Sequence, residues 1–309
     1  MNQLKSIVVG VDFSDCSRSA LHQAVRIAQW NQAHLHVVHV IEYLVISDLA
    51  DALGHTIARI QADAVRHAKG QLEAWLAEFG PSMPRSVDVL VGPPIDGILR
   101  KVQSTEADLL VLGVHGDSML PASAGTLATK CVRKAPCKVM LVEARHARPF
   151  QTVVACVDFS ELSREAVAQA LRVAAQDQSH VYFLHVFDGP WKRLPYCAKT
   201  LETATDFQHQ YRTRLEQRLK EFVGDTPPGV VTHFAVFNAS NFRCGIAEYA
   251  RPVRADLVVL GTKGRTNLKY MMLGSTVERL LRDVPCSVLT VKPCNEGVRV
   301  PFENQDQPQ

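Results

Sequence analysis

The sequence lacks the features that mark several classes of protein. Eight of its 309 residues are cysteine, but no two form a Cys-x-x-Cys pair, so neither a zinc site nor a disulfide framework is indicated. No apolar run approaches the ~20 residues of a membrane-spanning helix, and no leader pattern opens the chain. The net charge is only +3, with acids and bases interspersed, which argues against nucleic acid as the main partner. We therefore expect a soluble, cytoplasmic protein that binds neither a membrane nor nucleic acid.

The sequence does contain an internal repeat. Val11-Asp12-Phe13-Ser14 recurs as Val157-Asp158-Phe159-Ser160, and Ala135-Pro136-Cys137 is matched by Val284-Pro285-Cys286. The offsets of these pairs are 146 residues (157 − 11) and 149 residues (284 − 135). An offset that stays nearly constant along the chain indicates a duplication. We expect two domains, residues 1–146 and 147–293, followed by a flexible tail at residues 294–309.

Each repeat alternates short apolar runs with segments of helical periodicity. Residues 7–14 are typical of a buried strand that ends in an acidic turn, and residues 35–40 of a second strand. Apolar residues at helical spacing predict a helix through residues 20–28 and a longer one over residues 55–79. This alternation predicts an α/β fold of two tandem, doubly wound parallel-sheet domains, each Rossmann-like with about five strands. Ligands of such sheets bind beyond the carboxyl ends of the strands.

The last predicted strand of each repeat needs a partner. Residues 139–142 and 288–291 are apolar and each follows a Pro-Cys pair. Left unpaired, such strands would be sheet edges prone to aggregation. We expect them to pack on each other, so that the two halves form a pseudo-dimer within one chain. The pattern leaves further dimerisation of the whole chain open.

The second repeat contains a glycine-punctuated loop, Gly261-x2-Gly264-x9-Gly274-Ser275, between an apolar strand and a helix predicted from Thr276. Glycines let the backbone approach a bound group, and the free amides of a helix start favour an anion. Lys263, Arg265 and Lys269 add positive charge. The combination suits a polyphosphate, although the glycines would also be explained if they only turned the chain and opened the helix.

The loop and the repeat together resemble the universal stress protein family, whose nucleotide motif is Gly-x2-Gly-x9-Gly-Ser/Thr. The chain is similar to a tandem universal stress protein over nearly all of residues 4–293. The resemblance implies that ATP binds in the C-terminal half, with Mg²⁺ held through the phosphates alone. The nucleotide-binding residues that it implies are Val157, Asp158, Val186, Leu260, Gly261, Gly264, Arg265, Gly274, Ser275 and Thr276.

The first repeat departs from this pattern. Gly113-x2-Gly116 is followed by only eight residues before Gly125-Thr126, and the loop between them contains no Lys or Arg. Asp117 stands where the second repeat has Arg265, so a negative charge would repel phosphates there. We expect the N-terminal half to be structural and the C-terminal half to bind the nucleotide.

Other candidate sites are weaker. His34, His36 and His39 resemble a metal cluster, but on a strand only His34 and His36 share a face. Asp158 has no second carboxylate or histidine at a recognisable offset, so a hydrogen bond to the ligand or a helix cap is the better interpretation. Ser275 has no identifiable base, which favours an anion ligand over a nucleophile. We therefore assign no catalytic residue and no metal ligand.

These observations predict a stress-response protein that binds ATP and acts as a nucleotide-dependent sensor or adaptor for a protein partner that the sequence does not identify. Two alternatives remain open. The chain could be a protein–protein interaction module with no bound nucleotide, in which the pseudo-dimer surface binds the partner. It could also be a slow ATPase, which the sequence supports least because no general base is visible.

Overall fold

The computed structural model describes residues 4–80, 84–116, 126–192, 201–262 and 286–293. Within these ranges strands and helices alternate, as the sequence predicts. The strands are β1 (Ser6–Gly10), β2 (His34–Ile41), β3 (Arg85–Val91), β4 (Leu109–Gly113), β5 (Lys138–Val142), β6 (Thr152–Cys156), β7 (His180–Phe187), β8 (Val231–Asn238), β9 (Leu257–Gly261) and β10 (Ser287–Val291). The helices are α1 (Asp15–Asn31), α2 (Tyr43–Leu53), α3 (Ile57–Ala77), α4 (Pro94–Ser104), α5 (Thr126–Lys134), α6 (Glu161–Asp177), α7 (Leu201–Val223), α8 (Phe242–Ala250) and the 3₁₀ turn η1 (Pro190–Lys192).

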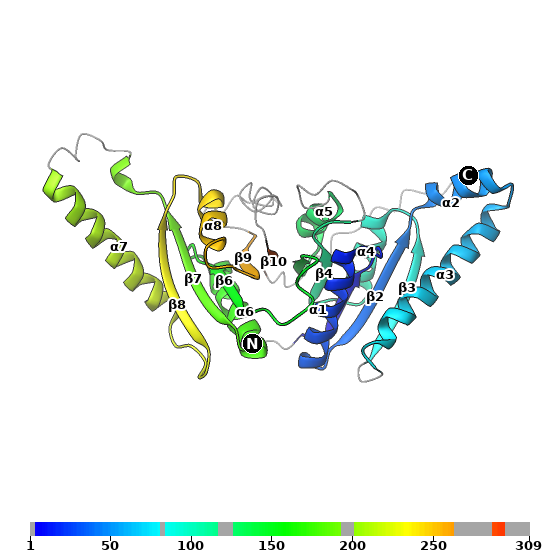
Figure 1. Cartoon of the computed structure of the whole chain (residues 1–309), viewed down its shortest axis with the longest axis horizontal. Helices are drawn as coiled ribbons and strands as arrows, with labels where there is room; N and C mark the ends of the chain where they lie inside the picture. Colours follow the sequence, from blue (N-terminus) through cyan, green and yellow to red (C-terminus); the bar gives the residue numbers. More distant parts are fainter. Residues whose placement is uncertain (1–3, 81–83, 117–125, 193–200, 263–285, 294–309) are drawn as a thin grey trace.

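The ten strands form one continuous sheet in the order β3-β2-β1-β4-β5-β10-β9-β6-β7-β8. Each half contributes five parallel strands, and the two sets join where β5 and β10 pair antiparallel. Figure 1 shows β10 near the centre of the molecule and β3 and β8 farther out, followed by α3 and α7. The predicted fold class, two doubly wound parallel sheets related as a pseudo-dimer, is confirmed.

The repeat is visible in how the helices begin and end. Ser14 caps α1 by accepting a hydrogen bond from the amide of Ser17, and Ser160 caps α6 by accepting one from Ser163, both at 3.2 Å. Such caps satisfy amides that a helix start would otherwise leave unpaired. Both helices end at a glutamine in the left-handed region, with φ 55° at Gln32 and 56° at Gln178. The duplicated sequence therefore sets the same helix limits twice.

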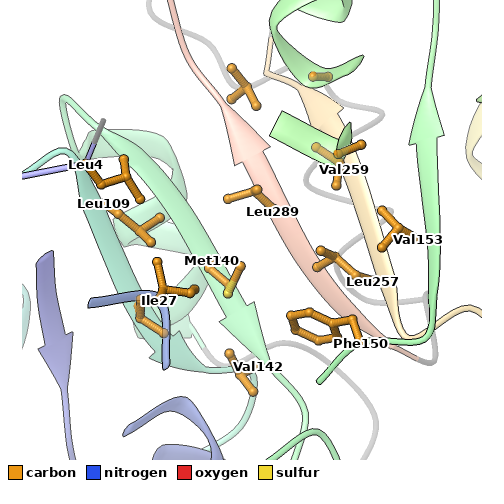
Figure 2. Close-up of a cluster of buried hydrophobic side chains, with 14 of the residues drawn as sticks. Leu4, Ile27, Leu109, Met140, Val142, Phe150, Val153, Leu257, Val259 and Leu289 are labelled. Carbon is orange, nitrogen blue, oxygen red and sulfur yellow. The ribbon is translucent and has the colours of Figure 1, made fainter. Parts of the chain in front are cut away.

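Helices cover both faces of the sheet. Residues of α1, α3, α6 and α7 share one buried cluster with the strands, and residues of α4, α5 and α8 share the other. The first cluster runs through the junction of the halves without a break, since it includes Met140 of β5 and Leu289 of β10. Figure 2 shows these two side chains together with Ile27 of α1 and Phe150 of the connecting segment. The two halves therefore share a core.

The junction of β5 and β10, which we call the seam, has a defined register. Leu141 pairs with Val288, Met140 with Leu289 and Val139 with Thr290. The Thr290 hydroxyl also donates to the Val139 carbonyl at 3.1 Å. The predicted pairing of the last strands is thus correct, and neither strand is left as a free edge.

Polar contacts fix the segment that connects the halves. The Gln23 side-chain amide donates to the carbonyls of His146 (2.7 Å) and Arg148 (2.6 Å). Asp177 of α6 accepts a hydrogen bond from the amide of Phe150 at 2.8 Å and forms an ion pair with Arg26 of α1. Because α1 and α6 belong to different halves, these contacts hold the halves in one orientation.

His146 lies in this connecting segment, and only 8% of the residue is exposed. Its Nδ1 is 2.7 Å from the hydroxyl of Ser287 on β10, and its Nε2 is 3.6 Å from the carboxylate of Asp256. Burial lowers the pKa of His146, and attraction to Asp256 opposes that shift only in part. His146 is therefore held neutral in the folded chain at neutral pH.

The sequence pattern missed α2 and η1. The strand and acidic turn predicted over residues 7–14 are β1, which ends at Gly10, and the turn from Val11 to Ser14 into α1. The long helix predicted over residues 55–79 is α3, Ile57–Ala77. Among the residues described above, no helix combines the length and the hydropathy needed to cross a lipid bilayer.

A double-mutant cycle across the seam tests the β5–β10 register. Met140→Ala and Leu289→Ala should each lower the free energy of unfolding by about 2–5 kcal/mol, because both residues are buried. Since they are cross-strand partners, the double variant should depart from additivity by about 0.5–3 kcal/mol in urea titrations. Val231→Ala, at a residue 47% exposed, should change stability by less than about 0.5 kcal/mol. Strict additivity would contradict the contact.

The neutral state of His146 predicts an acid-sensitive seam. Its folded-state pKa lies below the unfolded value, so below about pH 6.5 the unfolded chain binds a proton that the folded chain excludes, and stability falls with pH. His146→Gln should make the loss of unfolding free energy between about pH 7.5 and 5.5 smaller than in the parent chain. Some loss should remain, because burial also lowers the pKa of His22 and His36. His67→Gln, at an exposed histidine, should retain the parental slope, and an unchanged slope in His146→Gln would contradict the prediction.

Candidate functional site

The candidate site lies at the carboxyl ends of two neighbouring strands of the second half. β6 and β9 are paired, with Val153 opposite Leu257 and Ala155 opposite Val259. From β6 the chain continues to β7 on one side, while β9 is followed by β10 on the other. This is the point where strand order reverses, at which open α/β sheets bind ligands. Asp158 follows β6 and Gly261 ends β9, so the topology brings these two predicted residues to the same end of the sheet.

A strained turn positions Asp158. The next residue, Phe159, has φ 63°, in the left-handed region that bulky side chains rarely adopt. Asp158 Oδ1 accepts hydrogen bonds from the amide (3.0 Å) and hydroxyl (2.5 Å) of Ser160, the residue that caps α6. Among the described residues, none donates a hydrogen bond to Oδ2 of this half-buried carboxylate. That oxygen can therefore accept a hydrogen bond from a ligand.

His185 and Phe159 support this turn, and neither was among the site residues predicted from the sequence. The Val157 carbonyl accepts a hydrogen bond from His185 Nδ1 at 2.7 Å, which fixes the proton on Nδ1. The Phe159 ring lies 4.5 Å from the His185 ring, and the Arg218 guanidinium lies 4.2 Å over Phe159. The signal was present in the repeat, because the first half holds the same pair: His39 Nδ1 lies 2.7 Å from the Val11 carbonyl.

The predicted aliphatic site residues have buried side chains. Val157, Val186 and Leu260 are 4–6% exposed, so they can offer a ligand mainly backbone groups. Val186 packs against α8, where a Cβ at Gly245 would come within 2.7 Å of Val186 Cγ1. Gly261 is required by packing as well, because a Cβ there would lie 2.9 Å from Cβ of Leu162 on α6.

The remaining predicted residues, Gly264, Arg265, Gly274, Ser275 and Thr276, lie outside the described part of the chain, and their role in the site stays a prediction. The last residue before them, Thr262, is 5% exposed. Its amide and hydroxyl both donate to the Val291 carbonyl, at 2.9 and 3.2 Å. The start of the predicted phosphate loop is therefore attached to β10, the strand of the seam.

The equivalent place in the first half has more negative charge. Asp12 accepts hydrogen bonds from the amide and hydroxyl of Ser14, and a Cβ at Gly116 would lie 2.8 Å from Asp12 Oδ2. Glu143 follows β5 at the same end of the sheet, with its carboxylate 3.7 Å from His115 Nε2. Two carboxylates thus stand near the start of this loop, and they would oppose a bound anion. Asp117 and Gly125 lie beyond the described residues.

The histidines of β2 are structural in the described part of the chain. His34 and His36 share a face with ring centroids 4.4 Å apart, while His39 binds the Val11 carbonyl on the other face, as predicted. His36 Nδ1 lies 2.8 Å from Ser86 Oγ, and burial lowers the pKa of His36 to about 4, with His34 and Lys101 acting in the same direction. Among the residues that the structure describes, no three His, Cys, Asp or Glu side chains are arranged to hold a metal ion.

Comparisons with known proteins agree with this architecture. The model of the universal stress protein family matches twice, at residues 3–143 and 149–292. Universal stress protein E of Photorhabdus laumondii is 24% identical over 98% of this chain and 99% of its own, and a universal stress protein of Mycolicibacterium smegmatis is 27% identical over 93% and 97%. The crystal structure of a universal stress protein from Archaeoglobus fulgidus has the same fold, with a TM-score of 0.61 at 15% identity, covering 94% of this chain and 99% of that one.

The close approach of β9 and α6 at Gly261 can be tested directly. Gly261→Ala places a methyl group 2.9 Å from Leu162 Cβ, so the free energy of unfolding should fall by about 1–3 kcal/mol. Gly70→Ala is the matched control, since a Cβ there meets nothing within 4 Å on helix α3. It should raise stability by about 0.5–1 kcal/mol. Equal effects of the two substitutions in urea unfolding would contradict the packing described.

Proposed function

The chain belongs to the universal stress protein family, and on that premise we propose that it binds ATP at the carboxyl ends of β6 and β9 in its C-terminal half. The protein would act as a sensor or adaptor in a stress response, because bound nucleotide would change its affinity for a protein partner. The observation that carries the proposal is that Asp158 and Gly261 lie at the same end of two paired strands, β6 and β9, at the switch point. Gly261 also begins the complete motif Gly261-x2-Gly264-x9-Gly274-Ser275.

The roles of the residues follow from their chemistry. Asp158 Oδ2 would accept a hydrogen bond from a ribose hydroxyl or the base, while backbone groups at Val157 and Val186 would border the adenosine. Gly264 and Gly274 would let the chain approach the phosphates, and Arg265 would offset their charge. Ser275 and Thr276, at the predicted helix start, would donate to the terminal phosphates. Mg²⁺ would bind through the phosphates, since the acidic residue assigned to the site lies at its adenosine end.

A sensor also needs a route from the ligand to the rest of the protein. Thr262 at the start of the loop binds the Val291 carbonyl on β10, and β10 is the strand that pairs with the first half. Binding of ATP at the loop would therefore act on the seam between the halves. This attachment supports a nucleotide-dependent adaptor over a module whose loop has no ligand.

The asymmetry of the two halves predicts one ATP per chain. Isothermal titration calorimetry of the purified protein with Mg-ATP should give a stoichiometry near one, because the first-half loop is shorter and lies beside Asp12 and Glu143. Gly274→Asp should weaken ATP binding by at least ~100-fold, since it adds a side chain and a negative charge where the phosphates meet a helix start.

Gly125→Asp is the matched control for that substitution, because it makes the same change at the corresponding glycine of the first half. It should leave the affinity for ATP within about twofold of the parent chain. A stoichiometry of two would contradict the asymmetry. The absence of binding, with no nucleotide carried through purification by mass spectrometry, would overturn the proposed function.

A further inference from the structure

Helix α2 carries an exposed apolar surface that the proposed nucleotide site does not use. The helix packs on α3, and within it only Ile46 and Ala50 are buried. Large apolar side chains on its other sides and at the start of α3 remain exposed. The members of this surface, the α2 patch, are Tyr43 (50% exposed), Leu44 (70%), Val45 (51%), Leu49 (45%), Leu53 (58%) and Ile57 (37%).

The α2 patch is large for a chain that works as a monomer. A large apolar side chain has a full accessible area of roughly 200 Å², so these exposed fractions amount to about 600 Å² of apolar surface. That value is at the upper limit of the largest patch on a typical monomer. Val45, Leu49 and Leu53, which lie on one side of the helix, account for about half of it, so a contact along that side would bury about 600 Å² of apolar surface between two copies. An interface of this size is typical of weak association.

We propose that two copies of this chain associate through the α2 patch, with α2 packed antiparallel against α2 of the second copy. Val45, Leu49 and Leu53 are spaced four residues apart and form a stripe along one side of the helix. A two-fold axis beside Leu49 sets the two Leu49 side chains together and each Val45 opposite the partner's Leu53. Such an isologous contact closes on itself and forms no fibre.

The charges around the α2 patch complement each other in this arrangement. Glu42 precedes α2, and the exposed residues His55 and Arg59 follow it in the turn and first residues of α3. Antiparallel packing brings Glu42 of each copy to the turn of the other, opposite the positive charge of Arg59. The exposed residues Asp48 and Asp51 form the rim.

A membrane surface fits the α2 patch less well. Helices that bind anionic lipid combine an apolar side with Lys and Arg on the polar side. α2 has two aspartates and no lysine or arginine. Figure 1 also shows α2 at one end of the long axis, away from the centre where β10 lies. A second chain at this place would leave both the seam and the nucleotide site uncovered.

The mass of the full chain in solution tests the proposal. Light scattering or equilibrium sedimentation over about 1–100 µM should show association to twice the chain mass of 34.2 kDa. The double variant Leu49→Glu/Leu53→Glu should raise the dissociation constant by at least ~100-fold, because it buries charge in the centre of the contact. Circular dichroism should show its fold unchanged, since both positions are exposed.

Val231→Glu is the matched control, at an apolar residue of similar exposure (47%) on the edge strand β8, and it should leave the dissociation constant unchanged. Glu42→Arg should weaken the dimer about tenfold, and adding Arg59→Glu should restore its affinity. Nonspecific association of apolar surfaces would not show this rescue by exchanged charges. A chain that stays monomeric at about 100 µM would overturn the proposal. So would a dimer that survives Leu49→Glu/Leu53→Glu, or one that Val231→Glu dissociates.

Discussion

The antiparallel pairing of β5 with β10 is the interaction on which the rest of the structure depends. Without it the molecule would be two five-stranded sheets, each ending in an apolar edge strand. With it, both buried clusters pass from one half to the other, and the connecting segment is fixed by Gln23, Arg26 and Asp177. The pairing also determines where a signal from the candidate site can go, because β9 lies between β6 and the seam strand β10.

The turn between the first strand and the first helix of each half costs free energy and is nevertheless formed twice. Phe13 and Phe159 have φ 65° and 63°, and a bulky residue in this region costs on the order of 1–2 kcal/mol. Each phenylalanine ring packs on a histidine that binds the carbonyl before the aspartate. Since the first half has the turn but not the complete glycine motif, the turn serves the fold itself. The nucleotide site proposed for the second half would use an aspartate that the fold already holds in place.

The sequence predicts the features that depend on local pattern. Apolar runs, helical spacing and the repeat identify the doubly wound parallel sheet of each half and the paired last strands, because these follow from burial and right-handed crossovers. α2 was missed because its apolar residues lie on its exposed side as well as beneath it, so no amphipathic pattern marks it. The contact of His185 with the Val157 carbonyl was missed because it depends on strand register and side-chain rotamer, which no spacing rule contains. Of the candidate site, the position of Asp158 and Gly261 at one end of the sheet follows from topology, and the apolar run that ends at Leu260 predicts its burial. The packing of Val186 against Gly245 could not be predicted, because it depends on how α8 lies on the sheet.

Fusion of the two halves explains why their ends could diverge. In a dimer of identical subunits, any change at the seam occurs twice, once on each side of the two-fold axis. In this chain the residues after the last strands differ: Glu143 follows β5 and lies near His115, while Lys292 follows β10 and donates to the carbonyls of Arg133 and Ala135 at the end of α5. Burial lowers the pKa of Lys292 to about 8, and the helix end favours its positive charge. A cation on one side of the seam with a carboxylate at the equivalent place on the other requires that the two copies be encoded separately. The same independence allows the glycine loops of the two halves to differ in length and charge.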